Sequence, residues 1–221
     1  MLTAQEIEKE LTAKHRLETA TFGMGCFWGP ESLFGSLPGV FRTRTGYTGG
    51  TTPSPTYRTL GDHTETVEID FDPDIISFEE VLMYFWRHHY PNRDEYKGRQ
   101  YLSSLRYHNE QQLEVIDQVK KVMEAKLGDP IETEVTKLDR FYLAEERHQK
   151  YYLKRYPGVL DQLAEIYPAA SRLTDSIFAA RLNGFVKGYG TKEQIMNEIK
   201  QWKITEESRG HLIRQFLQLK W

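Results

Sequence analysis

The sequence contains a single cysteine, Cys26, in 221 residues. One cysteine cannot form a disulfide within the chain, and the absence of disulfides is typical of proteins from a reducing compartment. No run of apolar residues approaches the roughly 18 that indicate a transmembrane helix. Residues 1–18 are charged throughout and lack the apolar segment of a secretory signal. We therefore expect a cytoplasmic protein with no membrane association.

Positive and negative charges are nearly balanced, with 29 Lys and Arg residues and 32 Asp and Glu residues. This small net charge of −3 argues against nucleic-acid binding, for which a strong basic excess is the usual signature. The seven histidines show no metal-ligand spacing, so we expect no metal site. Neither a phosphate-binding loop nor a serine hydrolase motif occurs. What remains is a globular composition with enough apolar residues, 39%, for a sizeable core.

Patterns along the chain predict a mixture of helices and strands. Capping residues and apolar stripes of helical spacing predict helices over 3–16, from Ser77, over 108–126 and over 144–156, and another with Pro30 in its first turn. Two or three further helices are predicted within 174–221. Alternating or β-branched segments predict strands over 17–24, 64–72 and 131–143. Polar or Gly/Pro-rich segments predict irregular connections at 46–56 and 91–106.

This order of elements predicts an α+β fold in which helices pack on a mixed β-sheet in two layers. We expect three parts. They are an N-terminal helical segment at 1–16, a catalytic domain at 17–170, and a helical C-terminal extension at 171–221 that packs on that domain.

Cys26 lies in the sequence Gly25-Cys26-Phe27-Trp28-Gly29, between a predicted strand and a predicted helix. A lone cysteine is as often a small buried apolar residue as a reactive one. Here the flanking glycines leave room for a substrate, and a helix N-terminus stabilises a thiolate and lowers the thiol pKa. This context favours a nucleophile. Phe27 and Trp28 are adjacent, so both are not expected to enter one core, and one or both can form an apolar wall beside the sulfur.

Glu65 has the same strand parity as Val67, Ile69 and Phe71, which predicts that its carboxyl points to the apolar side, while Glu68 and Asp70 point to water. Burial is expected to raise the pKa of such a carboxyl, as a general acid near neutral pH requires. The alternative is a salt-bridged residue at a frayed strand start.

Tyrosines are weaker candidates, because most of the 13 must be packing residues. Tyr57 and Tyr101 follow irregular segments, and a phenol there can donate a hydrogen bond to a substrate oxygen.

The residues around Cys26 resemble the GCFWG signature of the type A peptide methionine sulfoxide reductases. Further motifs fit this family in the expected order, so the resemblance covers roughly residues 17–156. They are Leu37-Pro38-Gly39-Val40, Gly46-Tyr47-Thr48-Gly49-Gly50, Pro55-Thr56-Tyr57-Arg58, His63-Thr64-Glu65, Phe85-Trp86-Arg87-His88-His89, Gln100-Tyr101, and Phe141-Tyr142-Leu143-Ala144-Glu145 with His148-Gln149.

This resemblance implies a two-layer fold with a ferredoxin-like core and reduction of the S epimer of methionine sulfoxide, in proteins or free. Cys26 would attack the sulfoxide sulfur and become a sulfenic acid, and Glu65 would protonate the oxygen. Tyr57 and Tyr101 would hold that oxygen, while Phe27 and Trp28 would surround the methyl group. The family needs no cofactor, and we expect a monomer.

Two departures from the family pattern matter. The usual second cysteine, which would reduce the sulfenic acid, is missing. An external thiol is therefore implied, such as thioredoxin, glutathione with glutaredoxin, or dithiothreitol in vitro. The usual substrate-binding Asp before the Gly-x-Gln-Tyr sequence is also missing, with Tyr96 in its place and Asp94 and Glu95 nearby. These departures leave two alternatives open. One is a different cysteine enzyme, such as a thiol peroxidase or transferase, and the other is a binding protein that recognises oxidised methionine without turnover.

Overall fold

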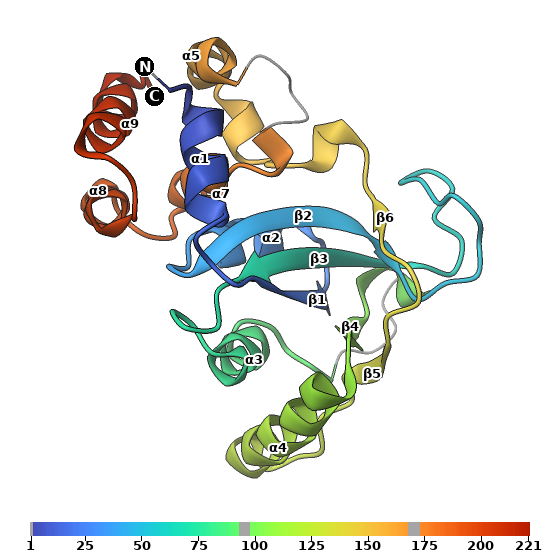
Figure 1. The fold of residues 1–221 in the computed structure, drawn as a ribbon. Coiled ribbons are helices and arrows are strands. Elements are labelled where there is room, and N and C mark those ends of the chain that lie inside the picture. Colours follow the sequence, from blue (N-terminus) through green and yellow to red (C-terminus); the bar gives the residue numbers. More distant parts are fainter. Residues whose placement is uncertain (1, 93–97, 168–172) are drawn as a thin grey trace.

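A computed structural model describes residues 2–92, 98–167 and 173–221 (Figure 1). Within these residues, one six-stranded sheet has the order β5-β4-β1-β3-β2-β6. Its strands are β1 (Glu18–Met24), β2 (Val40–Thr48), β3 (Thr64–Phe71), β4 (Ser103–Tyr107), β5 (Glu134–Lys137) and β6 (Tyr142–Leu143). The pairing is antiparallel except between β4 and β5, which run parallel. The sheet is therefore mixed, as expected.

The helices divide into those that connect strands and those that precede or follow the sheet in sequence. The connecting helices are α2 (Trp28–Gly35), α3 (Phe78–Arg87) and α4 (Glu110–Leu127). Before and after the sheet come α1 (Ala4–Thr12), α5 (Pro157–Ile166), α7 (Ile177–Lys187), α8 (Lys192–Gln201) and α9 (Glu206–Gln218). Short 3₁₀ turns are η1 (Gly98–Tyr101), η2 (Glu146–His148) and η3 (Leu153–Arg155).

The central part of the fold is ferredoxin-like. The chain order β1-α2-β2-β3-α3-β4 combined with the spatial order β4-β1-β3-β2 is the β-α-β-β-α-β arrangement. Helix α4 then connects β4 to the parallel strand β5, as a parallel crossover requires. The predicted α+β fold is confirmed.

One face of the sheet carries the apolar residues predicted from alternation. Val67, Ile69 and Phe71 are fully buried and pack with side chains of α2, α3 and α4. The predicted capping box of α3 is present, with Ser77 and Glu80 exchanging hydrogen bonds. Gly128 ends α4 in the left-handed conformation, as its position predicted.

The opposite face of β3 is polar but not fully exposed, which corrects the expectation that Glu68 and Asp70 point to water. Asp70 is only 5% exposed, because Arg42, Arg44 and Thr19 bind its carboxylate. Glu68 is half-buried and pairs with Arg44. A charged residue can thus have the parity of an exposed position and still be buried when a neighbouring strand supplies its counter-charge.

Helices α1, α5, α7, α8 and α9 share a second apolar core beside β2. In this core α7 packs directly on α2, and glycine permits the close approach: a Cβ added at Gly35 would lie 2.7 Å from the Ala180 carbonyl oxygen. Buried Glu8 of α1 accepts hydrogen bonds from Ser176 Oγ (2.9 Å) and Phe178 N–H (2.8 Å) at the start of α7. Among the described helices, none is both long enough and apolar enough to cross a bilayer.

Three local predictions were wrong. Strand β4 lies inside the segment predicted to be irregular, because its buried side chains include the polar Ser103, Ser104 and Arg106 and so give no apolar alternation. The predicted strand 131–143 is two short strands at opposite edges of the sheet. The predicted helix 144–156 consists of irregular chain with the turns η2 and η3.

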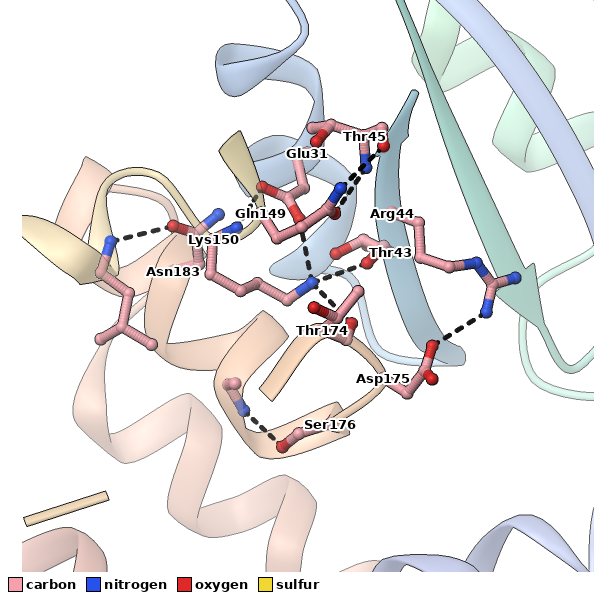
Figure 2. A network of polar contacts seen from close by, with 12 residues as sticks. Glu31, Thr43, Arg44, Thr45, Gln149, Lys150, Thr174, Asp175, Ser176 and Asn183 are labelled. Carbon is pink, nitrogen blue, oxygen red and sulfur yellow. Dashed lines mark hydrogen bonds and ion pairs between the residues drawn. The ribbon is translucent and has the colours of Figure 1, made fainter. Parts of the chain in front are cut away.

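The segment between η2 and η3 is fixed by a buried ion pair (Figure 2). Lys150 Nζ lies 2.9 Å from Glu31 Oε1 on α2, and it also donates to the carbonyl oxygens of Thr43 and Thr174. The backbone N–H of Lys150 donates to the other Glu31 oxygen. Both side chains are almost fully buried. Gln149 adds hydrogen bonds to both backbone groups of Thr45 on β2.

Replacing Lys150 with Met is expected to lower the free energy of unfolding by about 3–5 kcal/mol, because it leaves the buried Glu31 carboxylate without its counter-charge. Urea denaturation measures this. Lys154→Met is the matched control, because its pair with the half-exposed Glu146 contributes at most about 1 kcal/mol. Equal effects of the two substitutions would contradict this view of the buried pair.

The buried Glu8 makes the free energy of unfolding depend on pH. Burial raises the pKa of Glu8 from its ordinary value of 4.5 to about 7, against the hydrogen bonds from Phe178 and Ser176. The folded state thus holds a proton that the unfolded state releases, so stability falls as pH rises from about 4.5 to about 7. This amounts to at most about 3 kcal/mol, since each tenfold change in proton affinity is worth about 1.36 kcal/mol.

Thermal or urea unfolding at pH 5 and pH 8 measures this dependence. Glu8→Gln keeps an acceptor for Ser176 and Phe178 but has no titrating proton, so its stability should change less between these pH values than that of the wild type. Glu10→Gln, on the exposed side of α1, should behave as the wild type does. The idea fails if Glu8→Gln retains the full wild-type pH dependence.

Candidate active site

Cys26 lies in the turn that connects β1 to α2. Gly25 has a φ of +88°, a conformation that costs a side-chain-bearing residue strain, and it turns the chain out of the central strand. Helix α2 begins two residues after Cys26, at Trp28, so that Pro30 lies in its first turn as predicted. The Cys26 thiol is exposed, and a Cβ built on Gly29 would meet nothing within 4 Å. The sequence thus places an accessible sulfur at the start of a helix.

Glu65 lies next to this turn. Its carboxylate is fully buried, as the strand parity predicted, and it faces the same side of the sheet as its β2 partner Tyr47. One oxygen accepts the backbone N–H of Phe27 at 3.1 Å, and the other accepts Gln100 Nε2 at 2.7 Å. Phe27 directly follows Cys26, so this hydrogen bond fixes the carboxylate beside the sulfur.

The pKa of the Cys26 thiol is raised above its ordinary value, which corrects the prediction that the helix start lowers it. Partial burial is the main cause, and the negative charge of Glu65 adds to it. The N–H of Trp28 hydrogen-bonds the sulfur and acts in the opposite direction, but it does not outweigh these effects. The hydrogen bond from a single helix-terminal N–H therefore offsets only part of the effect of desolvation on this pKa, to which the charge of Glu65 adds. In the free protein the sulfur is mainly a thiol at neutral pH.

Tyr57 and Tyr101 reach the same site from two different connections. Burial raises the pKa of the Tyr101 phenol, and the charge of Glu65, the sulfur of Cys26 and a hydrogen bond with Tyr57 raise it further. Both tyrosine side chains are half-buried. Since the Tyr101 phenol keeps its proton throughout the physiological pH range, it is available as a hydrogen-bond donor beside Cys26 and Glu65.

The two aromatic residues after Cys26 have different environments. Phe27 is 1% exposed and packs in a small apolar cluster with Tyr47 and Ala144. Trp28 is half-buried, and its ring stacks on Tyr151 with the centroids 3.7 Å apart. Trp28, two residues after Cys26, therefore remains partly exposed, whereas Phe27 is buried.

Several residues that sequence reasoning assigned no role also belong to this site. Glu145 accepts hydrogen bonds from the Tyr47 hydroxyl (2.7 Å) and from the backbone N–H of Tyr57 (3.1 Å). His148 accepts the indole N–H of Trp28 at 3.2 Å, and Gln100 holds Glu65. The signal was present, because these residues lie within the motifs that carry the family resemblance.

Two further expectations concern ligands. Tyr96, Asp94 and Glu95, the candidates for the missing substrate-binding carboxylate, lie outside the described residues. Within the ranges that the structure describes, no group of three His, Cys, Asp or Glu side chains is arranged to hold a metal ion.

Comparison with known proteins shows the family of this chain. A sequence model of the peptide methionine sulfoxide reductase family matches residues 18–180. A peptide methionine sulfoxide reductase of Drosophila melanogaster is 43% identical over 194 residues, which is 87% of this chain and 78% of that protein. The peptide methionine sulfoxide reductase MsrA 1 of a Nostoc strain is 41% identical over 63% of this chain and 91% of its own length.

Solved structures are similar as well. Reduced Mxr1 from Saccharomyces cerevisiae has a TM-score of 0.60 and 27% identity, over 64% of this chain and 87% of its own. Methionine sulfoxide reductase A of Corynebacterium diphtheriae has a TM-score of 0.56 and 32% identity, over 64% of this chain and 76% of its own. Both the sequence and the structure thus show that the chain belongs to the peptide methionine sulfoxide reductase family and is an oxidoreductase of the MsrA type.

Proposed function

We propose that Cys26 and Glu65 together reduce the S epimer of methionine sulfoxide, in proteins and as the free amino acid, with Cys26 as nucleophile and Glu65 as acid. One observation carries this proposal. The buried Glu65 carboxylate accepts the backbone N–H of the residue next to Cys26, so that an acid and a nucleophile lie side by side at an accessible surface. A sulfoxide needs this combination, because its oxygen leaves only when it is protonated or strongly hydrogen-bonded.

The chemical step transfers the oxygen atom from one sulfur to the other. The Cys26 thiol gives its proton to the Glu65 carboxylate, and the resulting thiolate attacks the sulfoxide sulfur while Glu65 passes that proton to the sulfoxide oxygen. The hydroxyl group then moves from the substrate sulfur to the Cys26 sulfur as the bond between the two sulfurs breaks, so methionine leaves and Cys26 becomes a sulfenic acid. The substrate sulfur is reduced by two electrons and the Cys26 sulfur is oxidised by two.

The remaining predicted residues orient the sulfoxide. The phenols of Tyr57 and Tyr101 donate hydrogen bonds to its oxygen, and the raised pKa of Tyr101 supports this because the phenol stays protonated. Trp28 offers an apolar surface to the methyl group. Phe27 supports that surface from below, since its own ring is buried. Glu145 and His148 act indirectly, by positioning Tyr57 and Trp28.

The return of Cys26 to its reduced state needs a thiol from outside the chain, because the sequence contains no second cysteine. One thiol attacks the sulfenic acid and forms a mixed disulfide with loss of water, and a second thiol releases Cys26. Thioredoxin, glutathione with glutaredoxin, and dithiothreitol are reductants of the required type. We propose that the enzyme works as a monomer.

Cys26→Ser is expected to lower the rate of reduction of a methyl sulfoxide by dithiothreitol to the uncatalysed rate. A serine hydroxyl, unlike a thiol, cannot take up the oxygen of the sulfoxide to form a sulfenic acid. The wild type should consume the S epimer only, as chiral chromatography of the remaining sulfoxide would show. Failure of the wild type to reduce the S epimer while its thiol remains reactive would exclude the proposed function. That result would favour a binding protein or another cysteine enzyme.

Glu65→Gln is expected to have opposite effects on turnover and on thiol reactivity. It removes the acid, so kcat should fall by about a hundredfold or more. It also removes the charge that helps to raise the Cys26 pKa, so the pKa should fall and more thiolate should be present at pH 8. Alkylation by iodoacetamide at pH 8 should therefore become faster.

Glu79→Gln on the exposed face of α3 is the matched control and should alter neither rate. Unfolding would also expose Cys26 and speed alkylation, so the circular dichroism spectrum and the urea midpoint of Glu65→Gln must match those of the wild type for the two effects to be assigned to the carboxylate. A Glu65→Gln enzyme with full turnover would exclude its role as the acid.

A further inference from the structure

An open hollow of about 520 Å³ lies between the end of the η3 turn and the last turn of α7. Five residues line it, namely Tyr152, Arg155, Tyr156, Val186 and Lys187. Its size falls within the roughly 300–1,000 Å³ that small-molecule sites occupy. The η3 turn and α7 are in contact, and the hollow is therefore formed jointly by the η3 segment and α7.

The two sides of the hollow are held together by a specific contact. Asn183 of α7 accepts the backbone N–H of Leu153, the first residue of η3, at 3.0 Å (Figure 2). Lys187 lies one helical turn after Asn183 and so on the same face of α7. This places Lys187 toward η3, where its Nζ lies 4.7 Å from the centre of the Tyr152 ring. The hollow is thus a defined feature of the packing.

A chain of aromatic contacts connects the hollow to Cys26. Trp28, two residues after Cys26, stacks on Tyr151, and Tyr151 packs edge-on against Tyr152 with the ring centroids 5.4 Å apart. The sulfur is also close enough to Tyr152 for its charge to help raise the pKa of the phenol, although burial is the larger cause. Tyr152 therefore lines the hollow and also lies near the Cys26 sulfur.

The hollow is positively charged. Arg155 and Lys187 are exposed, and within the described part of the chain neither forms an ion pair. Their cationic groups lie instead near the aromatic rings of Tyr151 and Tyr152, and none of the five lining residues is acidic. Two cations without counter-charges at an aromatic surface favour a ligand with two carboxylates.

Helix α7 supplies part of this charge, from residues that follow the end of the family model's match. The family match stops at residue 180, so Val186 and Lys187 lie beyond it. The same chain lacks a second cysteine and so needs a thiol from outside. The cationic hollow contains Lys187 of α7 and is lined by Tyr152, which lies near the Cys26 sulfur. It therefore lies on a path by which such a thiol can reach Cys26.

We infer that this hollow binds a small peptide thiol with two carboxylates, of the glutathione type, and directs its sulfur to oxidised Cys26. The inference rests on the proposed function, because it assumes the Cys26 sulfenic acid. Arg155 and Lys187 bind the carboxylates, and the thiolate attacks the Cys26 sulfur. A sulfur–sulfur bond forms while the sulfur–oxygen bond breaks, and the hydroxide leaves as water. A second thiol then displaces Cys26 and yields the oxidised dimer of the thiol, so two thiols supply the two electrons.

Steady-state reduction of a methyl sulfoxide, at saturating sulfoxide and varied reductant, tests this. For the variant Arg155→Gln/Lys187→Gln, kcat/KM for glutathione should fall about tenfold, as expected for the loss of two exposed charge contacts. The rate with dithiothreitol, which has no carboxylate, should stay within about twofold of the wild type. The matched control Lys121→Gln/Lys126→Gln, on the exposed surface of α4, should change neither rate.

Glutathione diethyl ester provides a second measurement that needs no variant. The wild type should use the ester about as poorly as the double variant uses glutathione, whereas the variant should not distinguish the two thiols. Equal use of both thiols by the wild type overturns the inference, as does an equal fall with dithiothreitol. A fall with thioredoxin but not with glutathione also overturns it, because the hollow then binds a protein. If the wild type reduces no sulfoxide even with dithiothreitol, it is the proposed function that fails.

Discussion

The buried ion pair between Glu31 and Lys150 is the interaction on which the arrangement of the site depends. Glu31 belongs to the helix that begins just after the nucleophile, and Lys150 belongs to an irregular segment that follows the last strand. Lys150 has a φ of +51°, which is unfavourable by about 1–2 kcal/mol for a residue with a side chain. Hydrogen bonds from both its Nζ and its N–H to Glu31 offset that cost. A segment with little regular structure is thereby fixed against α2.

This constraint places the residues on either side of Lys150. His148 meets the indole of Trp28, and Tyr151 stacks on the same ring. On the sheet side, Glu65 is held by Phe27 N–H and by Gln100. Cys26 is therefore positioned from below by a strand and from the side by an irregular segment. Because the Glu65 charge raises the Cys26 pKa, the two groups oppose each other while both are ionised, and protonation of Glu65 relieves that opposition.

Sequence patterns predicted those parts of the fold and site in which local signals and tertiary environment agree. Alternation and capping boxes correctly predicted β3, α3 and α8. The position of Glu65 in β3 correctly predicted that its side chain is buried. The failures have a common physical cause, namely burial made possible by distant partners. Strand β4 lies inside the sheet although two of its buried residues are serines, and Asp70 is buried by arginines on β2. No local sequence pattern predicts these distant partners. The raised pKa of Cys26 was missed for the same reason, since it depends on desolvation and a charge from another strand.

The missing second cysteine gives the C-terminal helices a different significance from simple packing. An enzyme with a second cysteine converts its sulfenic acid to a disulfide within the chain, whereas a single-cysteine enzyme must leave the sulfenic acid itself open to another molecule. Helices α2 and α7 approach closely at Gly35, which fixes the position of α7 relative to the nucleophile. The same helix presents Lys187 at its end, beside the ring of Tyr152. A rigidly packed extension can thus supply charge next to the sulfur while the exposed side of Cys26 and Gly29 remains free for the sulfoxide. Substrate and reductant would then approach one sulfur from two different sides.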